Sequence, residues 1–185
     1  MVGHDFPLDS LYCCRFKKIR MKVHNVVNPS SLQTFTLSHQ QERPWNNDAK
    51  GHCYIWIRNS QNIDCMVHSW NPIHHDDAPP RGLVILFHAL GGHSMYPTVR
   101  YLAELLMKHN FCVYCGDFCG HGQSKGRRGY IESLDILLAD ANVIVDFARQ
   151  RHLCLPLFLG GVSLGGAVAI ALSTTQLKTQ VLVWF

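Results

Sequence analysis

The sequence predicts an α/β fold with a mainly parallel sheet and an antiparallel hairpin at its N-terminal side. Short apolar, β-type runs alternate with segments of about ten to twenty residues in which apolar side chains recur at helical spacing. Hydrophobic residues make up 47% of the 185 residues and charged residues only 16%. This composition can fill a core, and it excludes a disordered chain or a coiled coil.

The hairpin is predicted from two β-type runs, residues 52–58 and 64–70, which flank an Asn-Ser-Gln-Asn turn. Further strands are expected at 83–87, 111–115, 157–162 and 181–185. A helix should begin at Pro97, with Val99, Leu102, Leu105 and Leu106 on its apolar face. A second helix should follow the N-cap Ser133, with Leu134, Leu137, Leu138, Ala141, Val145 and Ala148 facing the core. A third is expected at 164–172.

Two regions are expected from these patterns. Residues 1–50 show little periodicity and are predicted to be an irregular N-terminal extension, with turn or linker composition at residues 43–48. Its basic segment, residues 15–22, is more typical of a solvated face than of a membrane contact, and both remain open. The net charge of +4 is too mild to indicate a nucleic-acid partner. Residues 51–185 form the predicted domain.

The eight cysteines are expected to be reduced thiols, because the chain shows no signal peptide and is long for a disulfide scaffold. Cys112 and Cys115 lie three positions apart on a predicted strand and should face opposite sides of the sheet. Residues 153–172 carry no charge, and a buried strand, turn and helix explains them better than a membrane span. The expected location is cytoplasmic or peripheral at membranes.

The strongest chemical motif is Gly161-Val162-Ser163-Leu164-Gly165, between a predicted strand and a predicted helix. G-x-S-x-G in this context is typical of a tight turn that lifts a nucleophilic serine above a sheet. Gly161 and Gly165 would leave room for the turn to close. The backbone N–H of Leu164 could then donate to an oxyanion.

The loop at residues 88–94 follows a predicted strand and is a candidate for a second oxyanion donor. Its glycine pair, which includes Gly91, should let the backbone approach a substrate closely. The segment at residues 117–126 resembles a dinucleotide loop but carries Lys125 at the third glycine position. Asp117 and His121 could be catalytic by residue type, but they are more typical of structural polar groups that hold a loop at the carboxyl edge of the sheet.

Three motifs in the same order and spacing resemble the monoacylglycerol lipase and lysophospholipase branch of the α/β-hydrolase superfamily. They are residues 88–94, residues 117–130 and residues 161–166. The resemblance implies hydrolysis of a lipid ester, such as a monoacylglycerol or lysophospholipid, without a metal or organic cofactor. It implies Ser163 as nucleophile and the N–H groups of Leu90 and Leu164 as the oxyanion hole. Ala89 departs from the family, which usually has glycine there, and should restrict the loop.

A larger departure concerns the other triad members, which follow the serine in this family. Residues 164–185 contain no Asp, Glu or His. We therefore expect a truncated α/β-hydrolase fold without cap and C-terminal strands, and the chain to be a fragment. The alternative is a catalytically inactive isoform that serves as a binding or decoy protein. A weaker third hypothesis is a nucleotide or metal binder using the glycine loops and cysteines, with Cys119 and His121 near the Cys112–Cys115 pair.

Overall fold

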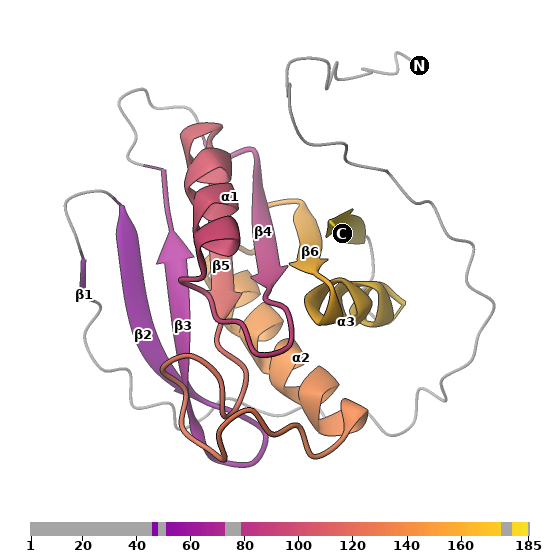
Figure 1. Cartoon of the computed structure of the whole chain (residues 1–185). Coiled ribbons are helices and arrows are strands. Elements are labelled where there is room, and N and C mark those ends of the chain that lie inside the picture. Colours follow the sequence, from indigo (N-terminus) through magenta and orange to yellow (C-terminus); the bar gives the residue numbers. More distant parts are fainter. Residues whose placement is uncertain (1–45, 48–50, 73–78, 175–178, 185) are drawn as a thin grey trace.

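The protein is described by a computed structural model that covers residues 46–47, 51–72, 79–174 and 179–184 (Figure 1). The strands in these ranges form one seven-stranded sheet in the order β1-β2-β3-β5-β4-β6-β7. The strands are β1 (Asn46–Asn47), β2 (His52–Arg58), β3 (Asp64–Trp70), β4 (Gly82–Phe87), β5 (Phe111–Gly116), β6 (Leu157–Val162) and β7 (Thr179–Trp184). The helices are α1 (Pro97–Lys108), α2 (Leu134–Arg151) and α3 (Leu164–Ser173).

The sheet has a parallel part and an antiparallel part. Strands β5, β4, β6 and β7 run parallel to one another, whereas β2 and β3 form an antiparallel hairpin and β3 runs antiparallel to β5. The predicted fold class is therefore confirmed. One strand was not expected: Asn46–Asn47 lies in a segment of linker composition, yet it pairs antiparallel with Cys53 and Tyr54 of β2. A strand of two residues is too short to show an alternation of apolar and polar side chains, so the sequence pattern does not predict it.

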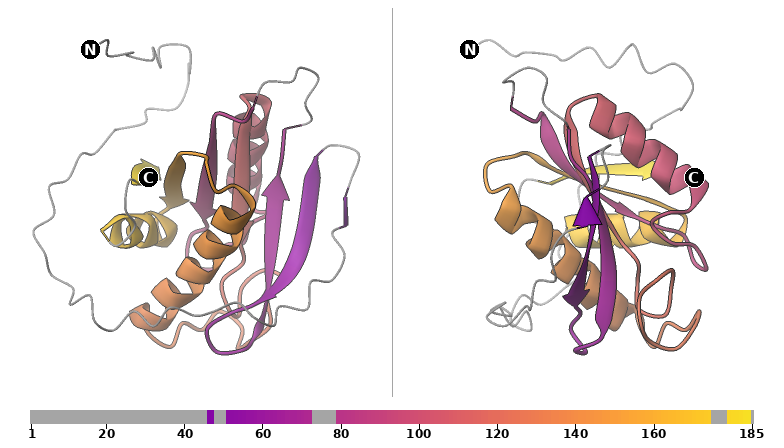
Figure 2. Two further views of the ribbon diagram at one scale, coloured as in Figure 1. Left: turned by 180° about the vertical axis from the view of Figure 1, so that it is seen from behind. Right: turned by 90° about the vertical axis from the view of Figure 1, so that its left-hand side faces the viewer.

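The helices cover both faces of the sheet, and each face has its own core. Figure 2 shows α1 and α2 on opposite sides of the strands. The larger cluster joins the sheet to α2 and α3, and the smaller one joins it to α1. Cys112 belongs to the first cluster and Cys115 to the second, as their spacing predicts. The two thiols therefore cannot share one metal ion or form a disulfide.

The helix predictions need two corrections. Leu134 was expected in the core but is 58% exposed, because it is the first residue of α2 and lies before the helix reaches the sheet. In α1, Leu102, Leu105 and Leu106 are all only partly buried; Leu102 and Leu106 pack against the core cluster and Leu105 does not, whereas Ala103 is fully buried in it. The N-cap prediction holds, since Ser133 Oγ accepts a hydrogen bond from the Ile136 N–H at 3.2 Å.

The uncharged run at residues 153–172 folds as β6, a turn and α3 rather than as one long helix. Among the described residues, none of the helices combines the length and hydropathy that a membrane crossing requires. Among the described cysteines, Cys65, Cys112, Cys115, Cys119 and Cys154 are free thiols. The basic segment at residues 15–22 lies outside the described residues.

Candidate active site

Ser163 occupies the turn between the end of β6 and the start of α3. Its φ of 52° and ψ of −114° are unusual for a residue with a side chain. Across the described ranges, the other non-glycine residues with positive φ are Asn62 and Asn110, a residue type that tolerates this region. Such backbone strain costs roughly 1–3 kcal/mol and persists only where the surroundings enforce it. The serine side chain is exposed at the carboxyl edge of the sheet.

Two glycines allow this turn to close. A Cβ on Gly161 would overlap the backbone of Gly165 and lie 2.7 Å from the Gly166 nitrogen. A Cβ on Gly165 would overlap the Phe87 carbonyl and lie 2.8 Å from the His88 carbonyl oxygen. The start of α3 is thus pressed against the end of β4. This contact brings the loop after β4 beside Ser163, in line with the proximity that the motifs predict.

The loop after β4 begins with a tight turn. The Gly92 N–H donates to the Ala89 carbonyl at 2.9 Å, and Gly91 has a φ of 72°. A positive φ at the third position of such a turn is what a type II turn requires. A Cβ on Gly91 would contact nothing within 4 Å. Gly91 is therefore needed for its backbone conformation, and the expected close approach of this loop to a substrate stays a prediction.

The two candidate oxyanion donors lie on different elements, the loop after β4 and the start of α3. Leu164 is the first residue of α3, so its N–H has no acceptor within the helix. Leu90 lies in the turn after β4, and its side chain is 64% exposed. The helix N-terminus also places partial positive charge beside Ser163. The Leu164 N–H and the N-terminus of α3 can therefore stabilise a negative charge close to the serine, whereas the role of the Leu90 N–H stays a prediction.

Asp117 joins the loop after β4 to the loop after β5. Its Oδ1 accepts hydrogen bonds from the N–H and Oγ of Ser94, both at 2.6 Å. Its Oδ2 accepts one from the Gln123 N–H at 2.8 Å. The side chain is 2% exposed, and a Cβ on Gly122 would overlap its carboxylate. These contacts agree with the expectation that Asp117 holds a loop.

The loop after β5 is also tied to β3. Ser124 Oγ donates to the Asp117 carbonyl at 2.6 Å and accepts from the Met66 N–H at 2.9 Å. The Lys125 N–H donates to the Asp64 carbonyl at 2.9 Å. The glycine loop that superficially resembles a dinucleotide site therefore folds back on its own sheet. Its hydroxyl and amide groups here are used internally, not presented to a ligand.

Two histidines near the elbow are buried. His88 bonds the Ala89 carbonyl through Nδ1 at 2.8 Å and accepts from the Phe118 N–H through Nε2 at 3.1 Å. Burial lowers the pKa of His88 to about 4. His121 bonds the Cys119 carbonyl through Nδ1 at 3.0 Å, and its ring centroid lies 5.4 Å from that of His88. Because both ring nitrogens of His88 are bound, this residue cannot act as a base for Ser163. In the sequence, His88 is marked by its position directly after a predicted strand, at the start of the motif at residues 88–94.

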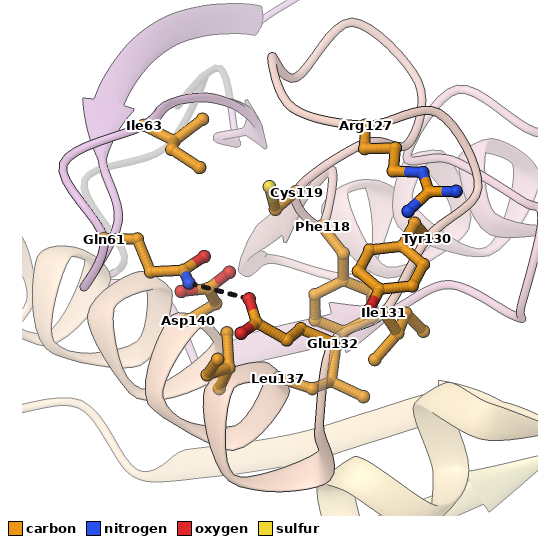
Figure 3. Close-up of a pocket in the computed structure, with 11 residues that line it drawn as sticks. Gln61, Ile63, Phe118, Cys119, Arg127, Tyr130, Ile131, Glu132, Leu137 and Asp140 are labelled. Atoms are coloured by element: carbon orange, nitrogen blue, oxygen red, sulfur yellow. Dashed lines mark hydrogen bonds between the residues drawn. The ribbon is translucent and has the colours of Figure 1, made fainter.

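A separate cavity of about 220 Å³ lies beyond these loops (Figure 3). Its walls come from the β2–β3 turn, the loop after β5 and the first turns of α2. Gln61 Nε2 donates to Glu132 across its rim at 3.3 Å. Asp140 accepts from Asn59 Nδ2 at 3.1 Å and from Ser60 Oγ at 2.8 Å. Ser163 does not line this cavity, which is smaller than ordinary ligand pockets of about 300–1,000 Å³.

A parallel sheet whose strand–turn–helix elbow presents an exposed, strained serine defines an α/β-hydrolase. Residues 78–183, more than half of the chain, match the family model described as serine aminopeptidase, S33 (Hydrolase_4). The chain therefore belongs to this family. The resemblance to monoacylglycerol lipases that the three motifs indicate is confirmed by curated relatives.

The human monoglyceride lipase is 36% identical over 101 residues, which cover 55% of this chain and 31% of the relative. The monoacylglycerol lipase of Mycolicibacterium smegmatis is 31% identical over 102 residues, covering 55% and 34% respectively. An α/β serine hydrolase homologue from Coxiella burnetii shares the fold with a TM-score of 0.60 and 19% identity, over 69% of this chain and 60% of that one. The chain spans about a third of the length of these curated relatives.

Proposed function

We propose that the chain contributes the nucleophile and oxyanion hole of a serine ester hydrolase acting on lipid esters, such as a monoacylglycerol or lysophospholipid. The observation that carries the proposal is the backbone of Ser163, which adopts a strained positive φ at the strand–helix junction with its side chain exposed. The curated lipases support the ester class. The exposed apolar side chains of Leu90 and Tyr96, on the loop beside the elbow, favour a lipid substrate.

In the proposed reaction, Ser163 Oγ loses its proton to a general base and attacks the ester carbonyl carbon. The carbonyl oxygen becomes an oxyanion that accepts hydrogen bonds from the N–H groups of Leu90 and Leu164. The C–O bond to the alcohol then breaks, the alcohol takes up the proton, and an acyl-Ser163 ester remains. Water hydrolyses this ester and releases the fatty acid. No metal or organic cofactor takes part in this scheme.

The scheme requires a general base that takes the proton of Ser163 Oγ. Within the described part of the chain, no histidine is hydrogen-bonded to Ser163, and residues 164–185 contain no Asp, Glu or His. The other candidate function is a non-catalytic protein that binds a lipid or a partner, and the lack of a histidine bonded to Ser163 in the described part of the chain favours it. A cytoplasmic or membrane-surface location is proposed for both, because a lipid ester or its product would be met there.

The test is substrate cleavage by the 185-residue protein. We expect slow release of fatty acid from a monoacylglycerol, no cleavage of an aminoacyl anilide, and loss of the activity in Ser163→Ala. Losing a triad member typically costs about 10⁴- to 10⁶-fold in turnover, so reactions should run for hours. Cleavage that persists in Ser163→Ala would reject Ser163 as nucleophile. Binding of the monoacylglycerol without any Ser163-dependent cleavage would favour the non-catalytic function.

A further inference from the structure

The carbonyl of Ala89 is held by two donors from opposite ends of its turn. The Gly92 N–H approaches it at 2.9 Å and His88 Nδ1 at 2.8 Å. One of these bonds closes the turn, and the other comes from a buried ring that is 1% exposed. The ring packs against the Phe118 and His121 rings, with centroids 4.6 Å and 5.4 Å away. Burial and these two ring contacts therefore hold the imidazole beside the carbonyl.

The hydrogen bonds fix the tautomer of this ring. The Phe118 backbone N–H can only donate, so His88 Nε2, 3.1 Å away, must accept. A neutral imidazole with a lone pair on Nε2 carries its proton on Nδ1. Nδ1 therefore donates to the Ala89 carbonyl. The lowered pKa of His88 agrees with a neutral ring at pH 7.

The Ala89 carbonyl shares a peptide plane with the Leu90 N–H. The described residues contain no cis peptide bond, so the two groups point in opposite directions across that plane. Fixing the carbonyl toward His88 therefore fixes the Leu90 N–H away from it. Leu90 itself is exposed, on the loop whose start contacts Gly165 of the elbow.

We propose that His88 is a positioning residue: its Nδ1–H orients the Ala89–Leu90 peptide so that the Leu90 N–H is held as an oxyanion donor beside Ser163. The catalytic value of this orientation rests on the proposed function, whereas the orientation itself does not. The imidazole acts through the peptide and exchanges no proton during the reaction. Nε2 of His88 accepts the hydrogen bond from the Phe118 N–H, and this bond serves only to anchor the ring.

The first test needs no variant. Long-range ¹H–¹⁵N spectra of the histidine rings distinguish a protonated ring nitrogen from one with a lone pair. For His88 at pH 7 we expect a protonated Nδ1 and an unprotonated Nε2. A proton on Nε2, or a charged ring, would overturn the proposal, because the proposal requires that Nδ1 is the only nitrogen of the His88 ring that carries a proton.

Two substitutions separate the two sides of the ring. In His88→Asn the amide nitrogen takes the place of Nδ1 and keeps a donor for the Ala89 carbonyl, while Phe118 loses its acceptor. In His88→Gln the side-chain oxygen reaches toward the Phe118 N–H, while the donor to Ala89 is lost. The probe is the Leu90 amide resonance in protein labelled with [¹⁵N]leucine, assigned with Leu90→Met. Val145→Ala, a core truncation in α2, controls for lost stability alone.

We expect the Leu90 resonance to stay near its parental position in His88→Asn and Val145→Ala, and to shift or broaden in His88→Gln. An unmoved resonance in His88→Gln, or equal shifts in both His88 variants, would overturn the proposal. Labelling of Ser163 by a fluorophosphonate is measured on the same samples. If the resonances behave as expected while Ser163 is unreactive even in the parent, the proposed function fails and the positioning stands. If both hold, labelling should slow at least tenfold more in His88→Gln than in His88→Asn.

Discussion

At the scale of single residues, the elbow is defined by what its glycines exclude. Gly161 and Gly165 face backbone atoms, which cannot move aside as the end of a flexible side chain can. Gly129 differs, because it has a φ of 66° but open space where a Cβ would lie. Steric exclusion and backbone strain can therefore be measured separately in this chain.

We expect Gly161→Ala and Gly165→Ala each to lower the free energy of unfolding by more than about 3 kcal/mol, or to prevent folding. Gly129→Ala should cost only about 1–2 kcal/mol, the usual strain of a left-handed residue with a side chain. Urea unfolding of the three variants measures this order. Elbow variants as stable as Gly129→Ala would show that β6 and α3 do not meet as described.

Two buried histidines predict acid sensitivity. Burial lowers the pKa of His68 and of His88 to about 4, below the ordinary 6.5, despite the nearby carboxylate of Asp117. His52 and His93 face His68, and His121 and His93 face His88, and these neighbours lower the pKa further. As the pH falls below 6.5, these two histidines take up protons in the unfolded chain but stay neutral in the folded chain. The free energy of unfolding that they contribute is therefore complete above pH 6.5 and is lost toward pH 4.

Urea midpoints between pH 7.5 and pH 4 test this dependence. The decline should begin near pH 6.5, before ordinary carboxylates titrate. It should be shallower in the double variant His68→Gln, His88→Asn, which removes both groups. A midpoint that is constant from pH 7 to pH 5 in the parent would contradict the burial of neutral imidazoles.

At the scale of elements, one carboxylate connects the hairpin to the second helix. Asp140 of α2 is 3% exposed and accepts hydrogen bonds from Asn59 and Ser60 in the β2–β3 turn. Burial raises the pKa of Asp140, and these hydrogen bonds oppose the rise. The bond partners are about eighty positions apart in the sequence. This contact fixes the hairpin turn beside α2.

Asp140→Ala should lower the free energy of unfolding by about 1–3 kcal/mol, because it leaves the buried Asn59 amide without its acceptor. Asp146→Ala is the matched control, since Asp146 lies on the same helix with an exposed side chain. The control should change stability by less than about 0.5 kcal/mol. Equal urea midpoints for the two variants would mean that the Asp140 bonds do not hold the hairpin.

Sequence patterns predicted some features of the strands and helices and not others. The bounds of β2 and β3 are as predicted because a polar turn separates two β-type runs, and Ser133 caps α2 as its residue type suggests. Asp140 was not predicted, because a carboxylate within an apolar helical pattern resembles any exposed residue until its distant partners are known. Leu134 was misplaced for the related reason that periodicity assigns a face but does not show where the sheet begins to cover it.

At the scale of the whole molecule, the sequence motifs identified the order of the elements around the elbow. Ser163, Gly161 and Gly165 lie where the strand–turn–helix pattern predicts. The sequence could not show that His88 holds the Ala89 carbonyl, or that Gly91 is needed for its φ. The ring of His88 is anchored by the Phe118 N–H, thirty positions away in the sequence, whereas the φ of Gly91 belongs to the local turn from Ala89 to Gly92. The roles of Ser163, Leu90 and Leu164 in catalysis stay predictions.

The two-sided core also predicts thiol reactivity. Burial raises the pKa of Cys112 to about 11 and of Cys65 to about 12, and it raises that of Cys115 as well. Cys154 is exposed, so among the described thiols it should be alkylated first by iodoacetamide at pH 8. Peptide mass spectrometry after brief native labelling measures this order. Early alkylation of Cys115 would contradict the packing of α1 on the sheet.

An active-site-directed fluorophosphonate shows whether the elbow presents Ser163 as a nucleophile. The 185-residue protein is incubated with the probe for hours, digested, and the modified serine is located by mass spectrometry. We expect slow but selective modification of Ser163, with no adduct at any serine in Ser163→Ala. Modification spread over other exposed serines at the same rate, or an unmodified Ser163 in folded protein, would contradict it.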